Sequence, residues 1–235
     1  MEKISCILLP GLDGSGKFFD AFAAEIARFA DPVVVRYPNV HGLSYDELAD
    51  YAAATIPVDQ AFFIVAESFS GPVAISIAAR HPGQLQCLVL VATFARSPFP
   101  RVASLLATLL PVLTRFPLPQ WIIRLVLLNG RRPEVASEIQ GVIRTVPKDV
   151  LASRLRNVLT CDVTGLLRKI DVPVMAIRAD RDRLLPGKCT NEMVEFQSGI
   201  RIVGIDAPHF VLQIEPEVTA AKLVEPFLRE CIQGS

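Results

Sequence analysis

The sequence predicts an α/β protein with a mostly parallel central sheet and helices on both faces of that sheet. Short, nearly continuous apolar segments alternate with longer segments of helical periodicity, as expected for strands that are buried on both faces. A chain of 235 residues with 51% hydrophobic residues is long enough to bury such a sheet in one sizeable domain. No internal repeat or low-complexity tract interrupts the alternation.

The first part of the chain supplies four of the expected strands, with helices between them. Short apolar segments predict strands over 4–9, 33–37, 62–66 and 88–92. Helical spacing predicts helices over 18–29, 45–55 and 72–80. The end of the chain resumes this alternation, with expected strands at 172–178 and 201–205 and a helix at 216–231.

Between residues 97 and 164 the alternation lapses, and helices broken by prolines follow one another. Helical spacing covers 102–112, 120–128, 133–145 and 148–159. We therefore expect a helical insertion at 97–164 in a core made of residues 1–96 and 165–235. Most of its apolar side chains are expected to pack the insertion onto the core, and others to line a substrate pocket. Its arginines, at 101, 115, 124, 131 and 132, are expected to keep it solvated, unless one binds a substrate carboxylate or phosphate.

A serine follows the third strand at the point where the chain turns into a helix. In the G-x-S-x-G turn, small residues two positions before and after a serine allow a strained backbone to project its hydroxyl above the sheet. Ala66 and Ser70 take these two positions around Ser68. The alternative is that Ser68 caps the helix that begins near Phe69, and this segment alone does not separate the two.

A nucleophilic serine needs a base and an acid that orients the base, here in the chain order Ser, Asp or Glu, His. Asp180 and Asp182 follow one predicted strand, and His209 follows the next. Carboxyl ends of parallel strands meet at one edge of the sheet, so these loops are expected to converge with Ser68. Either aspartate could reach the imidazole, although Asp180 could instead pair with a neighbouring arginine or cap the turn. Asp206 is so near His209 in the sequence that we interpret it as a turn residue.

The other two histidines have contexts that favour structural or solvent-facing positions. His81 precedes Pro82 at the end of an apolar helix, where histidine commonly satisfies terminal carbonyls. His41 lies in a turn-rich stretch and either lines a pocket or, as we favour, faces solvent. His209 is therefore the candidate base.

The first strand leads into a glycine-rich bend at residues 10–16. An acyl-transfer serine needs amide donors for the oxyanion, and we expect these to be the backbone N–H groups of Leu12 and Phe69. Gly11 and Gly14 permit backbone geometry and a close approach that side chains would block.

The same bend also comes close to a nucleotide-binding motif. Residues 11–18 fit G-x-x-x-x-G-K-[ST] except at Phe18, which has no hydroxyl to hold Mg²⁺. No convincing apolar strand ends in a Walker-B aspartate. A P-loop nucleotide binder is therefore the less favoured alternative.

The order of these motifs, from residue 4 to about residue 227, resembles the α/β-hydrolase superfamily. The resemblance implies Ser68 as nucleophile, His209 as base and Asp182 as acid, since Asp182 stands four residues before Pro186 as in the family's Asp-x-x-x-Pro loops. It also implies that the insertion is a cap that lies over the serine. Pro10 replaces the usual histidine of the family's oxyanion loop, which weakens assignment to a subfamily.

The expected function is that of a serine hydrolase acting on an ester or thioester with an apolar acyl or alkyl group. The reaction would pass through an acyl-enzyme and need no metal or organic cofactor. Acyltransferases and carbon–carbon hydrolases use the same groups, and a slow-turnover binding or receptor-like protein would keep the same pocket. A dehalogenase is disfavoured because the nucleophile position holds serine and not aspartate.

Composition restricts the partners and the location. Lysine and arginine total 24, as do aspartate and glutamate, so the net charge is zero and nucleic-acid binding is disfavoured. The five scattered cysteines lack zinc-ligand spacing and are expected to be reduced packing residues. The apolar start is too short for export, which favours the cytoplasm. The apolar run 102–113 is too short to span a membrane, although reversible contact with a lipid interface stays open.

Overall fold

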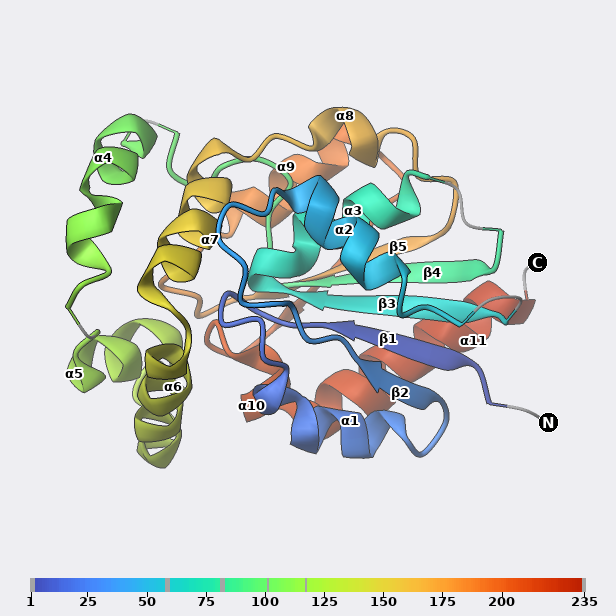
Figure 1. The fold of residues 1–235 in the computed structure, drawn as a ribbon. Helices are drawn as coiled ribbons and strands as arrows, with labels where there is room; N and C mark the ends of the chain where they lie inside the picture. The colour runs from blue at the N-terminus through green and yellow to red at the C-terminus, as the bar shows by residue number, and fades with distance from the viewer. Residues whose placement is uncertain (1–2, 58–59, 81–82, 101, 117, 234–235) are drawn as a thin grey trace.

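The computed structural model describes residues 3–57, 60–80, 83–100, 102–116 and 118–233. Its centre is a six-stranded sheet in the order β2-β1-β3-β4-β5-β6, in which every neighbouring pair is parallel (Figure 1). The strands are β1 (Ser5–Leu9), β2 (Asp31–Val34), β3 (Phe62–Glu67), β4 (Leu85–Val91), β5 (Val174–Ala179) and β6 (Arg201–Ile205). The predicted α/β class is confirmed, and the sheet is wholly parallel.

Helices bury both faces of the sheet. Alternate residues of a strand point to opposite faces. In β3, Ile64 and Ala66 join one apolar cluster, and Phe63 and Val65 join the other. The first face is covered by α2 (Tyr45–Ala53), α3 (Gly71–Ala78), α8 (Thr164–Leu167) and α9 (Lys188–Phe196). The second is covered by η1 (Lys17–Phe19), α1 (Asp20–Ile26), α10 (Val211–Ile214), η4 (Val218–Val224) and α11 (Glu225–Gln233).

The predicted second strand is the element whose position differs most from expectation. The structure places β2 at Asp31–Val34 instead of 33–37. The amide of Val35 still donates to the carbonyl of Leu8 at 3.0 Å, but the amide of Tyr37 donates to the carbonyl of Gly14 at 2.8 Å. Tyr37, at the end of the predicted strand, therefore bonds to the bend that follows β1 and not to β1 itself.

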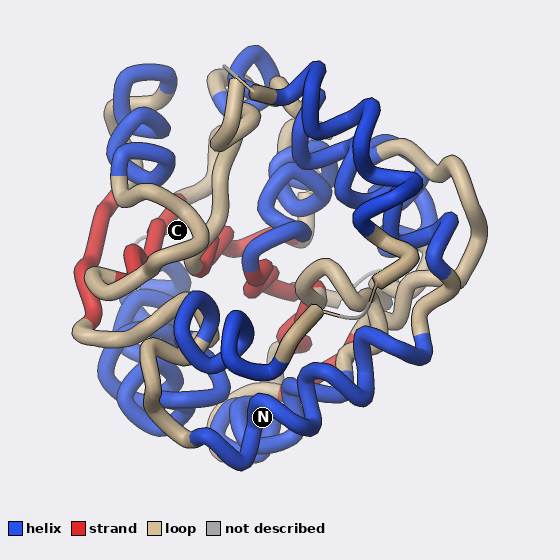
Figure 2. Tube along the Cα trace, turned by 90° about the vertical axis from the view of Figure 1, so that its left-hand side faces the viewer, coloured by secondary structure: helices blue, strands red, loops and turns tan. Residues whose placement is uncertain are grey.

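The inserted segment, residues 97–164, lies beyond the carboxyl ends of the strands, at the left of Figure 1. It contains α4 (Ala103–Leu113), α5 (Gln120–Ile122), the π-helical η3 (Ile123–Leu127), α6 (Pro133–Thr145) and α7 (Lys148–Thr160). Figure 2 views the molecule from this side. The two ends of the segment lie side by side, since the amide of Ser97 donates to the carbonyl of Cys161 at 2.8 Å.

Candidate active site

Ser68 occupies a strained turn between β3 and the helical turn η2 (Ser68–Ser70), which continues into α3. Its φ angle is 51°, in the left-handed region that residues other than glycine rarely adopt. The hydroxyl of Thr93 donates to the Ser68 carbonyl. A Cβ atom at Gly71 would lie 2.0 Å from the Thr93 Oγ1, so this close packing against the turn requires glycine there.

The loops after β5 and β6 bring an aspartate and a histidine to this serine. Ser68 Oγ lies 2.8 Å from His209 Nε2, and His209 Nδ1 lies 2.7 Å from Asp182 Oδ2. The other oxygen of Asp182 accepts the amides of Leu184 and Leu185 at 2.8 and 2.9 Å. With Nδ1–H donating to the carboxylate, Nε2 is left to accept the serine hydroxyl proton. Ser68 therefore contacts the imidazole and does not cap the helix.

The remaining acidic and histidine candidates lie outside this chain of contacts. The carboxylate of Asp180 accepts from Arg178 Nε at 2.9 Å, which confirms the expected ion pair with a neighbouring arginine. His41 is exposed and does not line the cavity described below. His81 lies outside the described residues.

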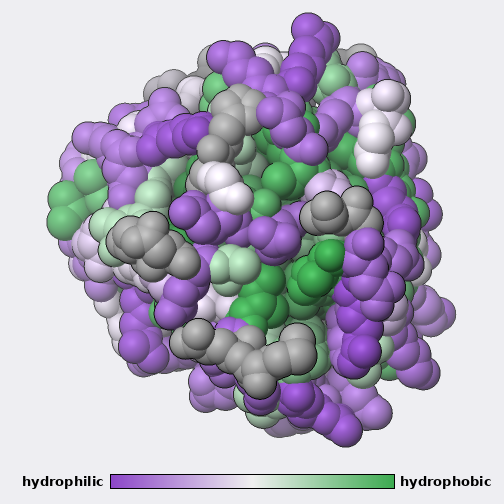
Figure 3. Space-filling view, turned by 90° about the vertical axis from the view of Figure 1, so that its right-hand side faces the viewer, coloured by the Kyte–Doolittle hydropathy of each residue, from purple (hydrophilic) through white to green (hydrophobic). Residues whose placement is uncertain are grey.

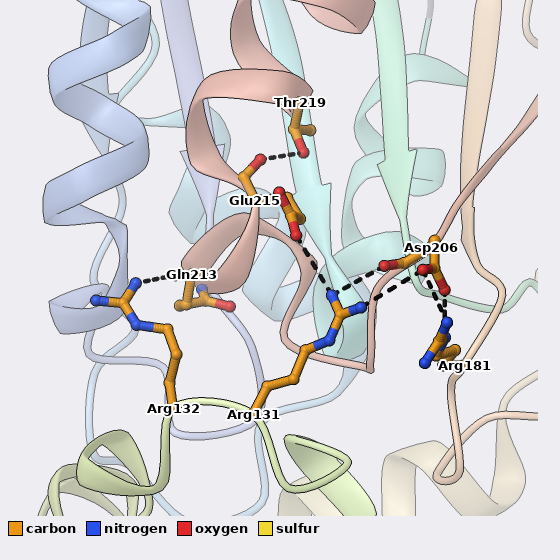
Figure 4. Close-up of polar contacts among 7 residues, drawn as sticks. All are labelled: Arg131, Arg132, Arg181, Asp206, Gln213, Glu215 and Thr219. Carbon is orange, nitrogen blue, oxygen red and sulfur yellow. Dashed lines mark hydrogen bonds and ion pairs between the residues drawn. The ribbon is translucent and has the colours of Figure 1, made fainter.

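Asp206, interpreted from the sequence as a turn residue, also contacts two arginines (Figure 4). Its side chain pairs with Arg181, and its carbonyl accepts from Arg131 Nη1 at 3.0 Å. Arg131 also pairs with Glu215 at 3.3 Å, and Arg132 Nη1 donates to the carbonyl of Gln213 at 3.0 Å. Both arginines remain partly exposed, as expected, and they also attach the inserted segment to the segment that carries His209.

The glycine-rich bend is bonded to the serine turn. The hydroxyl of Ser70 donates to the carbonyl of Pro10, and Tyr37 OH lies 2.6 Å from Ser70 Oγ. Both side chains are buried. Sequence reasoning selected Ser70 only for its small size, because nothing local to it indicates a bond to a residue sixty positions away.

The two predicted amide donors belong to the helix that follows the serine and to the glycine-rich bend. Phe69 is in the first turn of the η2–α3 helix, where amides lack acceptors within the helix. Leu12 lies on the bend and lines the same cavity as Ser68. Lys17, the lysine of the near-match to the nucleotide-binding motif, is exposed and does not line this cavity.

Arg154, a buried residue of α7, holds the bend from the opposite side. Its guanidinium donates to the carbonyls of Leu12 (3.1 Å), Asp13 (2.7 Å) and Pro38 (3.2 Å). Gly14 has a φ of 69°, and a Cβ atom there would lie 2.6 Å from Arg154 Nη1. The inserted segment therefore fixes the backbone that carries Leu12, a contact that the sequence analysis missed.

A cavity of about 580 Å³ opens above Ser68 and His209. This volume is in the range of small-molecule sites. Core residues such as Phe18 and Phe210 form one side, and residues of the inserted segment such as Leu110, Ile139 and Leu151 form the other. Its walls are predominantly apolar.

Glu67 lies at the base of this cavity, next to Ser68, and is 6% exposed. Gln213 Nε2 donates to Glu67 Oε2 at 3.1 Å, while Glu67 Oε1 and Gln213 Oε1 have no hydrogen-bond partner among the described residues. Burial raises the pKa of Glu67 to about 7, against the opposing effects of His209 and of the Gln213 hydrogen bond. Among the described residues, no group of three or more His, Cys, Asp or Glu side chains is arranged to hold a metal ion.

Comparison with known proteins gives the family. A family model described as the Alpha/beta hydrolase family matches residues 6–222. This chain belongs to that family. The α/β-hydrolase fold predicted from the sequence is thus confirmed, and the protein is a hydrolase. No curated protein matches the sequence.

Solved structures share this α/β-hydrolase fold at low sequence identity. A thermophilic esterase from Thermogutta terrifontis has a TM-score of 0.84 at 20% identity, covering 98% of this chain and 91% of its own. A hydrolase from Oleispira antarctica has a TM-score of 0.82 at 15% identity, with coverages of 97% and 92%. An enol-lactonase from Burkholderia xenovorans has a TM-score of 0.69 at 16% identity, with coverages of 99% and 91%.

Proposed function

We propose that this α/β hydrolase is a serine hydrolase that cleaves a carboxylic ester or thioester through an acyl-enzyme. The observation that carries the proposal is the continuous contact from Ser68 through His209 to Asp182, at the base of an apolar cavity. In this mechanism His209 takes the Ser68 proton as Oγ attacks the carbonyl carbon. Asp182 holds the imidazole tautomer and stabilises the imidazolium that forms.

The negative charge that develops on the carbonyl oxygen would be stabilised by the amides of Leu12 and Phe69. Such donors act strongly because they are fixed before the reaction and work in a site that excludes water. The bonds from Arg154 and Ser70 to the bend support this assignment, since they hold its backbone in one position. His209 then returns the proton to the leaving group, and a second cycle with water releases the acid.

The substrate we propose is a small molecule with an apolar acyl or alkyl group, because apolar side chains dominate the cavity walls. The inserted segment, residues 97–164, would act as a cap that completes this pocket and excludes water. The names of two structural neighbours, an esterase and an enol-lactonase, agree with chemistry at a carboxylic ester.

The same groups also serve acyltransferases and carbon–carbon hydrolases. The esterase or thioesterase reaction is preferred over acyl transfer because it needs only water as the acceptor. A slow-turnover binding protein would keep the cavity and lose the reactivity of the serine. The reactivity of Ser68 is therefore the property to measure first.

Labelling with a fluorophosphonate probe tests the mechanism. Wild-type protein is expected to be labelled at Ser68, and Ser68→Ala to lose all labelling. His209→Ala should slow it by a factor on the order of a thousand or more. Ser137→Ala is a matched control, because Ser137 is an exposed serine of α6 outside the cavity. Failure to label the wild type, or equal labelling of Ser68→Ala, would disprove the mechanism.

A substrate panel then tests the proposed class. p-Nitrophenyl esters and acyl-thioesters of graded chain length are expected to show kcat/KM rising with acyl length until the cavity is filled. A maximum at the shortest acyl group would contradict the apolar-substrate assignment. It would leave the serine mechanism intact.

A further inference from the structure

The inserted segment carries an unusual share of the exposed apolar surface. Among the described residues, nine of the twelve exposed large hydrophobic side chains lie between Val102 and Leu125. We call these nine the apolar face. Phe116, Trp121 and Leu105 are its most exposed members, at 71%, 66% and 62%. The opposite end of the molecule presents mostly hydrophilic residues, with apolar ones near its middle (Figure 3).

The stretch of chain that contains the apolar face carries charge of one sign. From residue 68 to residue 133 the sequence has seven arginines and no aspartate or glutamate. Arg115 and Arg124 are exposed beside the apolar face. Lys148 Nζ donates to the carbonyl of Arg115 at 2.9 Å, which places another cation there. Apolar residues bordered by cations match the chemistry of an anionic lipid surface.

The apolar face also continues into the cavity. Leu113, Phe116 and Leu118 are exposed by 51%, 71% and 39%, and all three line the cavity that reaches Ser68. A molecule that leaves a lipid layer at this face could therefore enter the cavity without exposing its apolar part to water.

We propose that the apolar face docks reversibly on a membrane surface that contains anionic lipids, and that the substrate enters the cavity from that surface. The entry of substrate rests on the proposed function, whereas the docking does not. No helix among the described residues is long and apolar enough to cross a bilayer, so the contact would be interfacial. A second copy of the chain is a poor occupant, because pairing two such faces would bring cations together without acids from residues 68–133.

Trp121 provides a local probe, since it is the one tryptophan in the sequence and belongs to the apolar face. Vesicles of phosphatidylcholine with phosphatidylglycerol are expected to shift its emission to the blue and to carry the protein down on centrifugation. Vesicles of phosphatidylcholine alone should bind more weakly, and high salt should weaken the binding to anionic vesicles.

Variants separate the apolar and electrostatic contributions. The double variant Leu105→Ser, Val112→Ser should weaken vesicle binding by about tenfold or more, because both side chains leave water on docking. Arg124→Gln should weaken binding to anionic vesicles by about fivefold and leave binding to neutral ones unchanged. Val40→Ser is the matched control, since Val40 is 53% exposed and lies outside the apolar face. None of these residues lines the cavity.

Three results would overturn the docking proposal. The first is that anionic vesicles cause no emission shift and no sedimentation. The second is that the Leu105→Ser, Val112→Ser variant binds these vesicles as tightly as the wild type. The third is an emission shift that depends on protein concentration in the absence of vesicles. The last would show that a second copy covers the face. Fluorophosphonate labelling in vesicle-free buffer is independent of docking. Labelled protein that ignores vesicles would disprove docking alone, and docking protein that resists labelling would disprove the hydrolase mechanism alone.

Discussion

Glu67 is the residue whose surroundings differ most from those of an ordinary carboxylate. It is buried next to Ser68, and Gln213 donates to one of its oxygens, while the other has no hydrogen-bond partner in the described part of the chain. Taking a carboxylate out of water favours its protonated form. Burial therefore raises the pKa of Glu67 to about 7, although His209 and Gln213 act in the opposite direction.

Because of this raised pKa, the protein becomes less stable as pH rises. In the unfolded chain Glu67 ionises near its ordinary value of 4.5, whereas the folded protein keeps the proton up to about pH 7. The folded state thus binds more protons between these values, and the free energy of unfolding decreases as pH rises through this window. Glu67→Gln removes this loss and should raise stability at about pH 8 by up to about 3 kcal/mol.

Denaturant unfolding of both proteins at about pH 4.5 and about pH 8 tests this prediction. The difference between Glu67→Gln and the wild type should be largest at the higher pH. Glu47→Gln is a control carboxylate, because Glu47 is on the surface, where its hydrogen bonds to Ser44 lower its pKa. A stability difference that does not change with pH would contradict the prediction.

Ser70 gives a second prediction at the scale of a residue. Ser70→Ala leaves the Pro10 carbonyl and the Tyr37 hydroxyl without their buried partner, which should cost about 1–3 kcal/mol of stability. It should also slow fluorophosphonate labelling about tenfold or more, because the bend carrying the Leu12 amide is no longer fixed.

Ser76→Ala is the matched control for Ser70→Ala. Ser76, in α3, is also a buried serine, but it contacts Asp46 and not the bend. Its loss is expected to affect stability without changing the labelling rate. If the two variants label equally fast under conditions where both are folded, Ser70 does not position the bend.

At the scale of elements, α7 connects the inserted segment to the bend through Arg154. Arg154→Met keeps much of the side-chain volume but removes the donors to three carbonyls. We expect lower stability and a lower kcat, with a smaller change in KM, because the proposed oxyanion donor at Leu12 loses its position while the cavity persists. Arg154→Lys should rescue only part of the loss, since an ammonium cannot reproduce the planar guanidinium.

Arg156→Met provides the comparison within the same helix. Arg156 is exposed two residues after Arg154, so its replacement should leave kcat and stability nearly unchanged. Steady-state kinetics with the best ester of the panel makes the measurement. A change in KM alone for Arg154→Met would mean that Arg154 shapes the cavity and does not position the bend.

The elements that could be predicted from the sequence are those with strong local patterns. β6, α6 and the start of α7 have the predicted bounds because their periodicity, prolines and flanking loops are local signals. The choice between Asp180 and Asp182 depends on how the chain turns after β5. Residues two positions apart give the same sequence pattern, so the residues alone left both open.

Contacts between distant segments were not predictable in the same way. Arg154 meets the carbonyl of Leu12 from 142 residues away. A signal was nevertheless present, since Val150, Arg154 and Val158 fall at helical spacing on one stripe of α7. The sequence held a similar signal for Glu67, because it is an acidic residue at the end of an apolar strand. A charged residue at a position that the pattern assigns to the interior is therefore a candidate part of the site.

At the scale of the whole molecule, the charge is balanced in total and uneven in distribution. Equal numbers of basic and acidic residues give a net charge of zero, yet residues 68–133 have no acid. Four arginines of this region belong to the described part of the inserted segment. Arg131 and Arg132 bond to the core around His209, while Arg115 and Arg124 remain on the surface. Net charge alone did not reveal this asymmetry.

The reactivity of the cysteine thiols measures how completely the core excludes solvent. All five lie among the described residues, are buried and form no disulfide. Burial raises the pKa of Cys161 to about 12 and that of Cys189 to about 11, so little thiolate is present at neutral pH. Cys6 and Cys87, each 0% exposed on the central strands, are accessible only when the sheet opens.

We therefore expect Ellman's reagent to label the native protein at least about a hundredfold more slowly than the protein unfolded in guanidinium. A reducing agent should leave Tm unchanged, because no disulfide contributes to stability. Mapping by mass spectrometry should find Cys231 among the earliest labelled positions, since at 8% exposure it is the least buried of the five. Rapid native labelling of Cys6 or Cys87 would contradict this packing, because both pack between the sheet and the helices on its second face.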